Sequence, residues 1–397
     1  MGPIGRAAIT YAVYFVAIGA SWSYLPVYYR DLGLDLAAIG LLAAMSSAIG
    51  LLAAPAWGAL ADRYPRSRLG LPAAAFVAAA GAFGLASAGT LPQIATWVGL
   101  LALGSAGIGP VLDARVLDLL GAAQARYGQI RAIGSAAFVV VTWLVGVLLD
   151  REGSGALFRV FVPALAVTAL VALSVPRCGG GRRPGTWHRL GAFLRSPGMV
   201  VFLVGALLTW TLLSAANGFY SIQVIVLGGT AQMVGLAWVA GAVVEVPVMW
   251  AYPRLAARFG AGRLLVAGAA ILPVRAALAA VSPDAPWLVA ISPLQGLGFA
   301  LFLVGGVGFV SSRAPAGLAA MAQGIFSASW GLGAILGTGL GGIVAGSTSI
   351  AFLFGAAAVG GVVAAAVVGL AARSSGRPGA AAVPAELSQL VPEEVHR

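Results

Sequence analysis

Charge is scarce in this sequence: only 9% of its 397 residues are charged, whereas a soluble domain carries roughly a quarter. Lysine is absent, so all 23 basic residues are arginine. Cys178 is the only cysteine, which excludes an internal disulfide and a cluster of thiol metal ligands. The two histidines, His188 and His396, stand apart, and no GxxxxGK[ST] segment could cradle nucleotide phosphates. These absences argue against an enzyme, a metal site, a bound cofactor and a fused ATP-driven pump.

Apolar residues take the place of charge. They make up 60% of the chain, and the mean hydropathy is +0.97. Apolar runs of about 20 residues, each long enough to cross the hydrocarbon core of a bilayer as a helix, recur along the whole length. The pattern predicts an all-α membrane protein with twelve transmembrane helices, at approximately 7–29, 36–60, 69–89, 92–118, 127–149, 157–175, 198–226, 231–256, 264–282, 286–311, 317–345 and 348–372.

The arginines predict how these helices are oriented. With the N-terminus in the cytoplasm, 17 of the 23 arginines fall in cytoplasmic segments, three outside and three within helices. The positive-inside rule expects such a split. We therefore expect an integral protein of the cytoplasmic (inner) membrane with both termini in the cytoplasm. The same distribution explains the net charge of +11, so we expect membrane lipid and not nucleic acid as its partner.

The predicted helices fall into two six-helix bundles, at residues 1–176 and 198–373. Between them, residues 177–197 form a Gly-rich, basic segment that we interpret as a cytoplasmic linker. The tail, 374–397, is rich in Ala, Pro and Glu, a composition typical of disorder.

The two halves are related in sequence. Shifted by 195 positions, residues 39–69 align without a gap on residues 234–264 of the second half, and Arg63 meets Arg258. Secondary transporters are commonly built from such repeats, with a substrate site near the bilayer midplane between them. Because one chain supplies both repeats, we expect a monomer that binds a small-molecule substrate.

The loop after the second span, GALADRYPRSR (58–68), resembles the loop signature of the major facilitator superfamily, G-x-L-A-D-R/K-x-G-R/K-R/K. Pro65 replaces the usual Gly, and Ser67 interrupts the basic pair. The alternative, a plain loop that obeys the positive-inside rule, stays open. The resemblance implies a gating role at the cytoplasmic face for Gly58, Asp62, Arg63, Arg66, Arg68 and, in the second repeat, Arg258.

Three further segments resemble the phenylpropionate-permease-like transporters, relatives of the lactose and nucleoside proton symporters. They are PVLDARVLDLLGAAQARYGQIRAIGS (110–135), GAVVEVPVMW (241–250), and LPVRAAL with DAPWLVAISPLQGLGFALF (284–302). Where that family often carries His in the tenth helix, this chain has Gln295. The family's charged positions are occupied here by Asp113, Arg131, Glu245 and Arg275.

A charge at a helix centre costs roughly 2.5–3.5 kcal/mol on insertion scales, so these four residues predict a function or an ion pair. Glu245 precedes Gly260 by 15 residues and Arg275 follows it by 15, so an antiparallel hairpin that turns at Gly260 would place both at one depth. Asp113 and Arg131 flank position 122 in the same way, nearer the cytoplasm. We interpret both pairs as proton-coupling or substrate groups; structural ion pairs are the alternative.

Aromatic and amide side chains in several spans could line a mostly apolar cavity with a few polar groups, which suits an amphipathic organic solute. Interfacial or lipid-facing positions are the alternative for each. The candidates are Tyr14, Trp22, Tyr24, Trp210, Asn217, Trp238, Gln295 and Trp330.

The favoured function is secondary active transport by alternating access, as symport of protons with an aromatic acid, a nucleoside or a sugar-like solute. Two alternatives stay open. One is a proton-driven efflux antiporter for drugs or sugars, although the Gly-Pro signature usual in the fifth helix of drug antiporters is absent from GSAAFVVVTWLVGVLL. The other is a membrane sensor that transports nothing.

Overall fold

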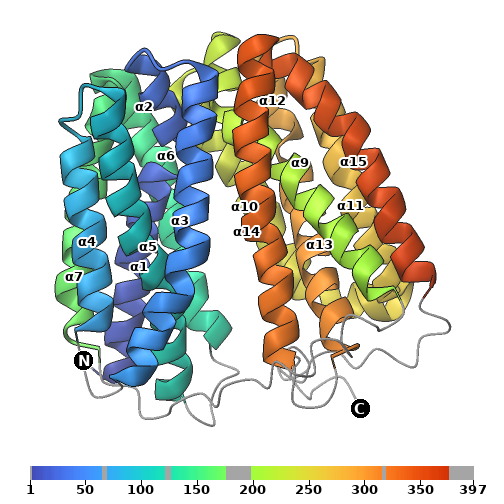
Figure 1. Ribbon diagram of the computed structural model, residues 1–397, viewed down its shortest axis with the longest axis horizontal. Helices are drawn as coiled ribbons and strands as arrows, with labels where there is room; N and C mark the ends of the chain where they lie inside the picture. Colours follow the sequence, from blue (N-terminus) through green and yellow to red (C-terminus); the bar gives the residue numbers. More distant parts are fainter. Residues whose placement is uncertain (1, 65–68, 121–126, 176–197, 315–318, 375–397) are drawn as a thin grey trace. The chain divides into compact units, whose positions relative to one another are not determined.

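The computed structural model describes residues 2–64, 69–120, 127–175, 198–314 and 319–374 (Figure 1). The predicted cytoplasmic linker and all but the first residue of the predicted tail therefore lie outside the described residues. Within them, the secondary structure is helical, as predicted. Eleven helical segments are long and apolar enough to cross a membrane, and a shorter apolar helix occupies the place of the predicted third span.

The helices follow the predicted spans closely. They are α1 (Pro3–Ser21), α2 (Leu25–Asp31), α3 (Leu36–Arg63), α4 (Gly70–Leu85), α5 (Leu91–Leu120), α6 (Tyr127–Glu152), the 3-10 turn η2 (Ser154–Leu157), α7 (Phe158–Ala172), α9 (Met199–Val226), α10 (Ala231–Phe259), α11 (Ala261–Ala280), α12 (Ala285–Ile291), α13 (Pro293–Ser311), α14 (Ala319–Ser347) and α15 (Ile350–Arg373).

Two predicted spans are each built from two helices. The first breaks between α1 and α2, and the tenth breaks at Ser292 between α12 and α13. In both cases a proline lies at the start of the second helix, Pro26 in α2 and Pro293 in α13. Proline is tolerated in the first helical turn because the N–H it lacks has no partner there in any case.

By packing, the chain forms two compact units. Of the described residues, unit 1 contains those within 1–182, 218–239 and 284–286, and unit 2 contains those within 183–217, 240–283 and 287–397. Helices α9 and α10 are thus shared, and most of their site residues belong to unit 2. The sequence-based domain limits stay a prediction.

Corresponding helices pack alike in the two units, as a repeat requires. In unit 1, α4 packs on α5 and α7; in unit 2, its counterpart α11 packs on α13 and α15. Trp57 and Tyr252 occupy positions related by the shift of 195. A Cβ on Gly107 would lie 2.6 Å from the Trp57 ring, and one on Gly305 would lie 3.0 Å from the Tyr252 hydroxyl. Each unit therefore sets a large aromatic residue against a helix glycine.

The hairpin predicted between the eighth and ninth spans turns at Gly260. This residue has φ +88°, a left-handed conformation that favours glycine, and it separates α10 from α11 directly. The depths of Glu245 and Arg275 were predicted by counting residues from this turn, and the structure has the turn at the expected position.

Asp150, near the end of α6, caps the first turn of α10 within unit 1. Its carboxylate accepts hydrogen bonds from the backbone N–H groups of Ala231, at 2.6 Å, and Gln232, at 3.0 Å. A negative group at a helix N-terminus satisfies orphan donors and complements the helix dipole. This contact fixes one end of the helix that carries Glu245.

We expect Asp150→Asn to lower the free energy of unfolding by about 1 kcal/mol, because the charge-assisted cap is lost. The fall in Tm of the purified protein in detergent measures this loss of stability. Glu152→Gln, on the same helix end, is the control: its ion pair with Arg159 is exposed, and such pairs contribute about 0–1 kcal/mol. An Asp150→Asn protein no less stable than Glu152→Gln would contradict the capping role.

Candidate functional site

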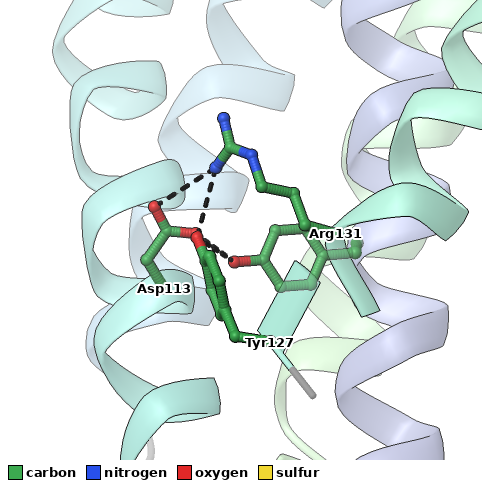
Figure 2. A network of polar contacts seen from close by, with 4 residues as sticks. Asp113, Tyr127 and Arg131 are labelled. Carbon is green, nitrogen blue, oxygen red and sulfur yellow. Dashed lines mark hydrogen bonds and ion pairs between the residues drawn. The ribbon is translucent and has the colours of Figure 1, made fainter. Parts of the chain in front are cut away.

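The Asp113–Arg131 pair is the centre of a polar network in unit 1 (Figure 2). A guanidinium nitrogen of Arg131 on α6 lies 3.6 Å from the carboxylate of Asp113 on α5. Arg131 also donates to the hydroxyl of Tyr127 at 3.2 Å. Tyr11 of α1 donates to the carboxylate, and its hydroxyl lies 3.4 Å from that of Tyr127. Three helices thus supply one connected set of charges and hydroxyls.

The ion pair of this network is accessible to solvent, whereas Tyr11 is buried. The side chain of Arg131 is 51% exposed and that of Asp113 is 34% exposed. Ion pairs this exposed contribute little to stability, about 0–1 kcal/mol, so holding the fold together is a weak reason for the pair to exist. An accessible carboxylate, guanidinium and phenol can instead exchange their partners with a polar solute.

Two residues of this network were not predicted from the sequence. Tyr127 lies four positions before Arg131 on one helix, a spacing that places side chains on the same face, so that signal was available. Tyr11 is 102 positions from Asp113, and nothing local in the sequence links them.

A second polar cluster lies in unit 2, around Arg275 of α11. One of its guanidinium nitrogens donates to Gln295 of α13 at 2.9 Å and to Asn217 of α9 at 3.0 Å. Arg275 is only 3% exposed, so these bonds form away from solvent. Because a guanidinium has no acceptor, the amide oxygens must face it, and the amide NH2 groups are directed elsewhere.

Glu245 lies on α10 beside this cluster in the packing of unit 2. A Cβ on Gly296, which follows Gln295, would lie 2.9 Å from the backbone nitrogen of Glu245 and still closer to the Gly241 carbonyl oxygen. The backbones of α10 and α13 therefore touch at this point. The Glu245 side chain is half-buried. An ion pair between Glu245 and Arg275 stays a prediction.

The cavity beside Arg275 is too small for an organic solute. It has a volume of about 20 Å³ and lies between α9, α11 and α15, with Thr209 and Arg275 as polar lining among apolar side chains. Such a volume holds about one water molecule.

The remaining candidates in unit 1 differ in exposure. Trp22 is 62% exposed, whereas Tyr24 is fully buried and its hydroxyl donates to the Thr142 carbonyl of α6. Trp238 donates through Nε1 to a serine hydroxyl of α9 at 3.1 Å, and Tyr14 is half-buried. The bonds of Tyr24 and Trp238 are internal to unit 1. A role for any of the four in lining a cavity stays a prediction.

The predicted gating residues are only partly described. Gly58, Asp62 and Arg63 lie in the last turns of α3, while Arg66 and Arg68 lie outside the described residues. Arg258 is exposed at the end of α10, with its guanidinium carbon 5.2 Å from the ring centroid of the next residue, a phenylalanine. Their gating role stays a prediction.

Apolar membrane-crossing helices, a repeated packing pattern and polar clusters within the spans define a secondary transporter of the major facilitator type. The model of the MFS_1 like family matches residues 5–356, so the chain belongs to that family. It is 32% identical to the maltose permease of Geobacillus stearothermophilus over 338 residues, covering 84% of this chain and 85% of that protein. The chain is thus a transporter and not an enzyme.

Two further proteins extend the comparison. The uncharacterized transporter YwbF of Bacillus subtilis (strain 168) is 24% identical over 325 residues, covering 80% of each chain. The crystal structure of the nucleoside transporter NupG superposes with a TM-score of 0.81 at 19% identity, covering 93% of this chain and 98% of that one. At that identity the superposition shows the shared fold. It confirms the prediction of two six-helix bundles as a fold class.

Proposed function

We propose that this protein imports a saccharide by symport with protons, by alternating access across the cytoplasmic membrane. The observation that carries the proposal is the cluster in which buried Arg275 holds the amide oxygens of Asn217 and Gln295. It fixes the amide NH2 donors of these two residues in place within an apolar bundle. Fixed amide donors suit the hydroxyl groups of a neutral polar solute.

The choice of a saccharide over the other solute classes rests on two supports. One is the likeness to a maltose permease, at 32% identity over most of both chains. The other is the Asp113–Arg131 network in unit 1, which combines an exposed acceptor, a donor and two phenol hydroxyls. Sugar hydroxyls both donate and accept hydrogen bonds, and the network contains acceptors and donors that can pair with them.

Glu245 is the proposed proton carrier. It is a half-buried carboxyl within a membrane span, and its backbone lies against α13 beside the cluster that holds Arg275. We propose that binding of a solute that engages Arg275 and the two amides is coupled to release or uptake of its proton. We further propose that both termini lie in the cytoplasm, as the arginine distribution favours, and that the protein is a monomer, because one chain supplies both repeats.

Uptake of radiolabelled maltose into proteoliposomes tests the function. With an acidic exterior, we expect accumulation above equilibrium that a protonophore abolishes, and competition by other saccharides. Aromatic acids and nucleosides complete the panel. Accumulation of one of these instead of a saccharide would overturn the substrate class, and uptake only under an outward proton gradient would favour export. Absence of any solute flux would favour a sensor.

A further inference from the structure

Three aromatic side chains form a cluster in unit 2. Trp330 of α14 stacks on Trp210 of α9, with ring centroids 4.9 Å apart and an interplanar angle of 12°. Phe299 of α13 meets Trp330 edge-on, at 5.7 Å and 72°. Trp210 is completely buried, whereas Trp330 remains 39% exposed. The cluster therefore has a buried base and one accessible indole.

Close helix packing holds this indole in place. A Cβ on Gly333 would lie 2.6 Å from the Trp210 Cβ, and one on Gly337 would lie 2.1 Å from the Thr211 carbonyl oxygen. Both glycines lie on the face of α14 that carries Trp330, because residues three and seven positions apart align on a helix. Only glycines let α14 approach α9 this closely, so the stack is set by backbone contact.

The exposed side of Trp330 differs from the apolar stripe of the same helix. Leu332, Leu336 and Ile343 are exposed on a face that lies about 200–240° around the helix from Trp330, and Leu340 is exposed at about 280°. Ser327, about 60° from Trp330, is exposed on the opposite side of the indole from Leu340. Trp330 therefore lies outside the stripe of exposed aliphatic residues and beside a serine, a position that suits contact with a polar solute.

The cluster adjoins the polar groups around Arg275. Asn217 follows Trp210 by seven residues on α9, and Phe299 follows Gln295 by four on α13, so each pair shares a helix face. At 1.5 Å per residue, the aromatic and amide groups are separated by about 6–10 Å along the helices. This is the span of one or two sugar rings.

We propose that Trp330, backed by Trp210 and flanked by Phe299, is a stacking subsite for the apolar C–H face of a pyranose ring. The hydroxyls at the ring edge would then reach the amide groups of Asn217 and Gln295. The subsite requires a cyclic saccharide and discriminates against acyclic polyols with the same hydroxyl groups. This proposal rests on the saccharide transport proposed above.

Equilibrium binding of radiolabelled maltose to the purified full chain tests the subsite. Trp330→Leu, which keeps apolar bulk and removes the ring face, is expected to raise the Kd about tenfold, and Trp330→Phe about threefold. Trp250→Leu is the control, because Trp250 is also exposed, at 63%, but lies on α10 outside the cluster. Sorbitol, an acyclic polyol, is expected to compete at least tenfold less well than maltose.

Each outcome has a definite consequence. A Trp330→Leu Kd within twofold of the wild-type value, or sorbitol competing as well as maltose, overturns the stacking subsite and leaves saccharide transport intact. A wild-type protein that binds no cyclic saccharide overturns the proposed substrate class and the subsite with it. If Trp330→Leu does not fold, the Phe variant decides: binding as tight as wild type overturns the subsite.

Discussion

Replacing Glu245 by Gln is expected to abolish proton-driven accumulation of substrate while exchange of substrate across the membrane continues. Glutamine keeps the size and the hydrogen-bonding capacity of the protonated acid but cannot release a proton. The carrier would then bind and reorient with substrate, yet gain nothing from a proton gradient. In proteoliposomes we expect accumulation to fall at least a hundredfold, with counterflow of labelled against unlabelled maltose within about fivefold of wild type.

Glu245→Asp provides the matched control, because it restores a titratable carboxyl one methylene shorter and should recover part of the accumulation. Loss of counterflow together with accumulation in Glu245→Gln would instead indicate that the residue is needed for binding or folding. An unchanged accumulation ratio with a normal proton current would refute the coupling role outright.

The spacing of charges and glycines made the hairpin that carries Glu245 and Arg275 predictable. Glu245, Gly260 and Arg275 lie at equal intervals, and the structure has the left-handed turn at Gly260 that the interval required. The prediction of the turn is confirmed, because helix rise is constant and only glycine adopts such a φ readily, whereas the pairing of the two charges stays a prediction. Depth along a hairpin follows from counting residues.

Rotation about the helix axis and contacts between distant segments were not predictable in the same way. Asn217 and Gln295 were candidates as polar residues in apolar spans, but their joint hold on Arg275 depends on how three helices pack. The hydrogen bond from Tyr11 to Asp113 likewise joins helices far apart in sequence. A span with low amphipathicity carries little information about which side faces its neighbours, because lipid and helix interiors are both apolar.

The close contact between α10 and α13 gives the second large expected effect. A Cβ added at Gly296 would lie only 1.9 Å from the Gly241 carbonyl oxygen, and that atom belongs to the backbone, which cannot rotate aside. Gly296→Ala must therefore separate the two helices. Overpacking of this kind costs about 1–3 kcal/mol or more, so we expect a clear fall in Tm.

The same substitution should also weaken substrate binding beyond its effect on stability, because Gln295 precedes Gly296 and Glu245 lies across the contact. Gly308→Ala is the control: it adds the same methyl to the same helix, where nothing lies within 4 Å of the new Cβ, and we expect it to fold and bind as wild type. If Gly296→Ala matches this control in both Tm and maltose Kd, the two helices are not held at this distance. Gly→Ala within a helix is by itself stabilising, through helix propensity and the unfolded state. The difference between the two variants therefore measures the contact that joins the proton carrier to the amide cluster, and equal destabilisation by both would contradict that contact.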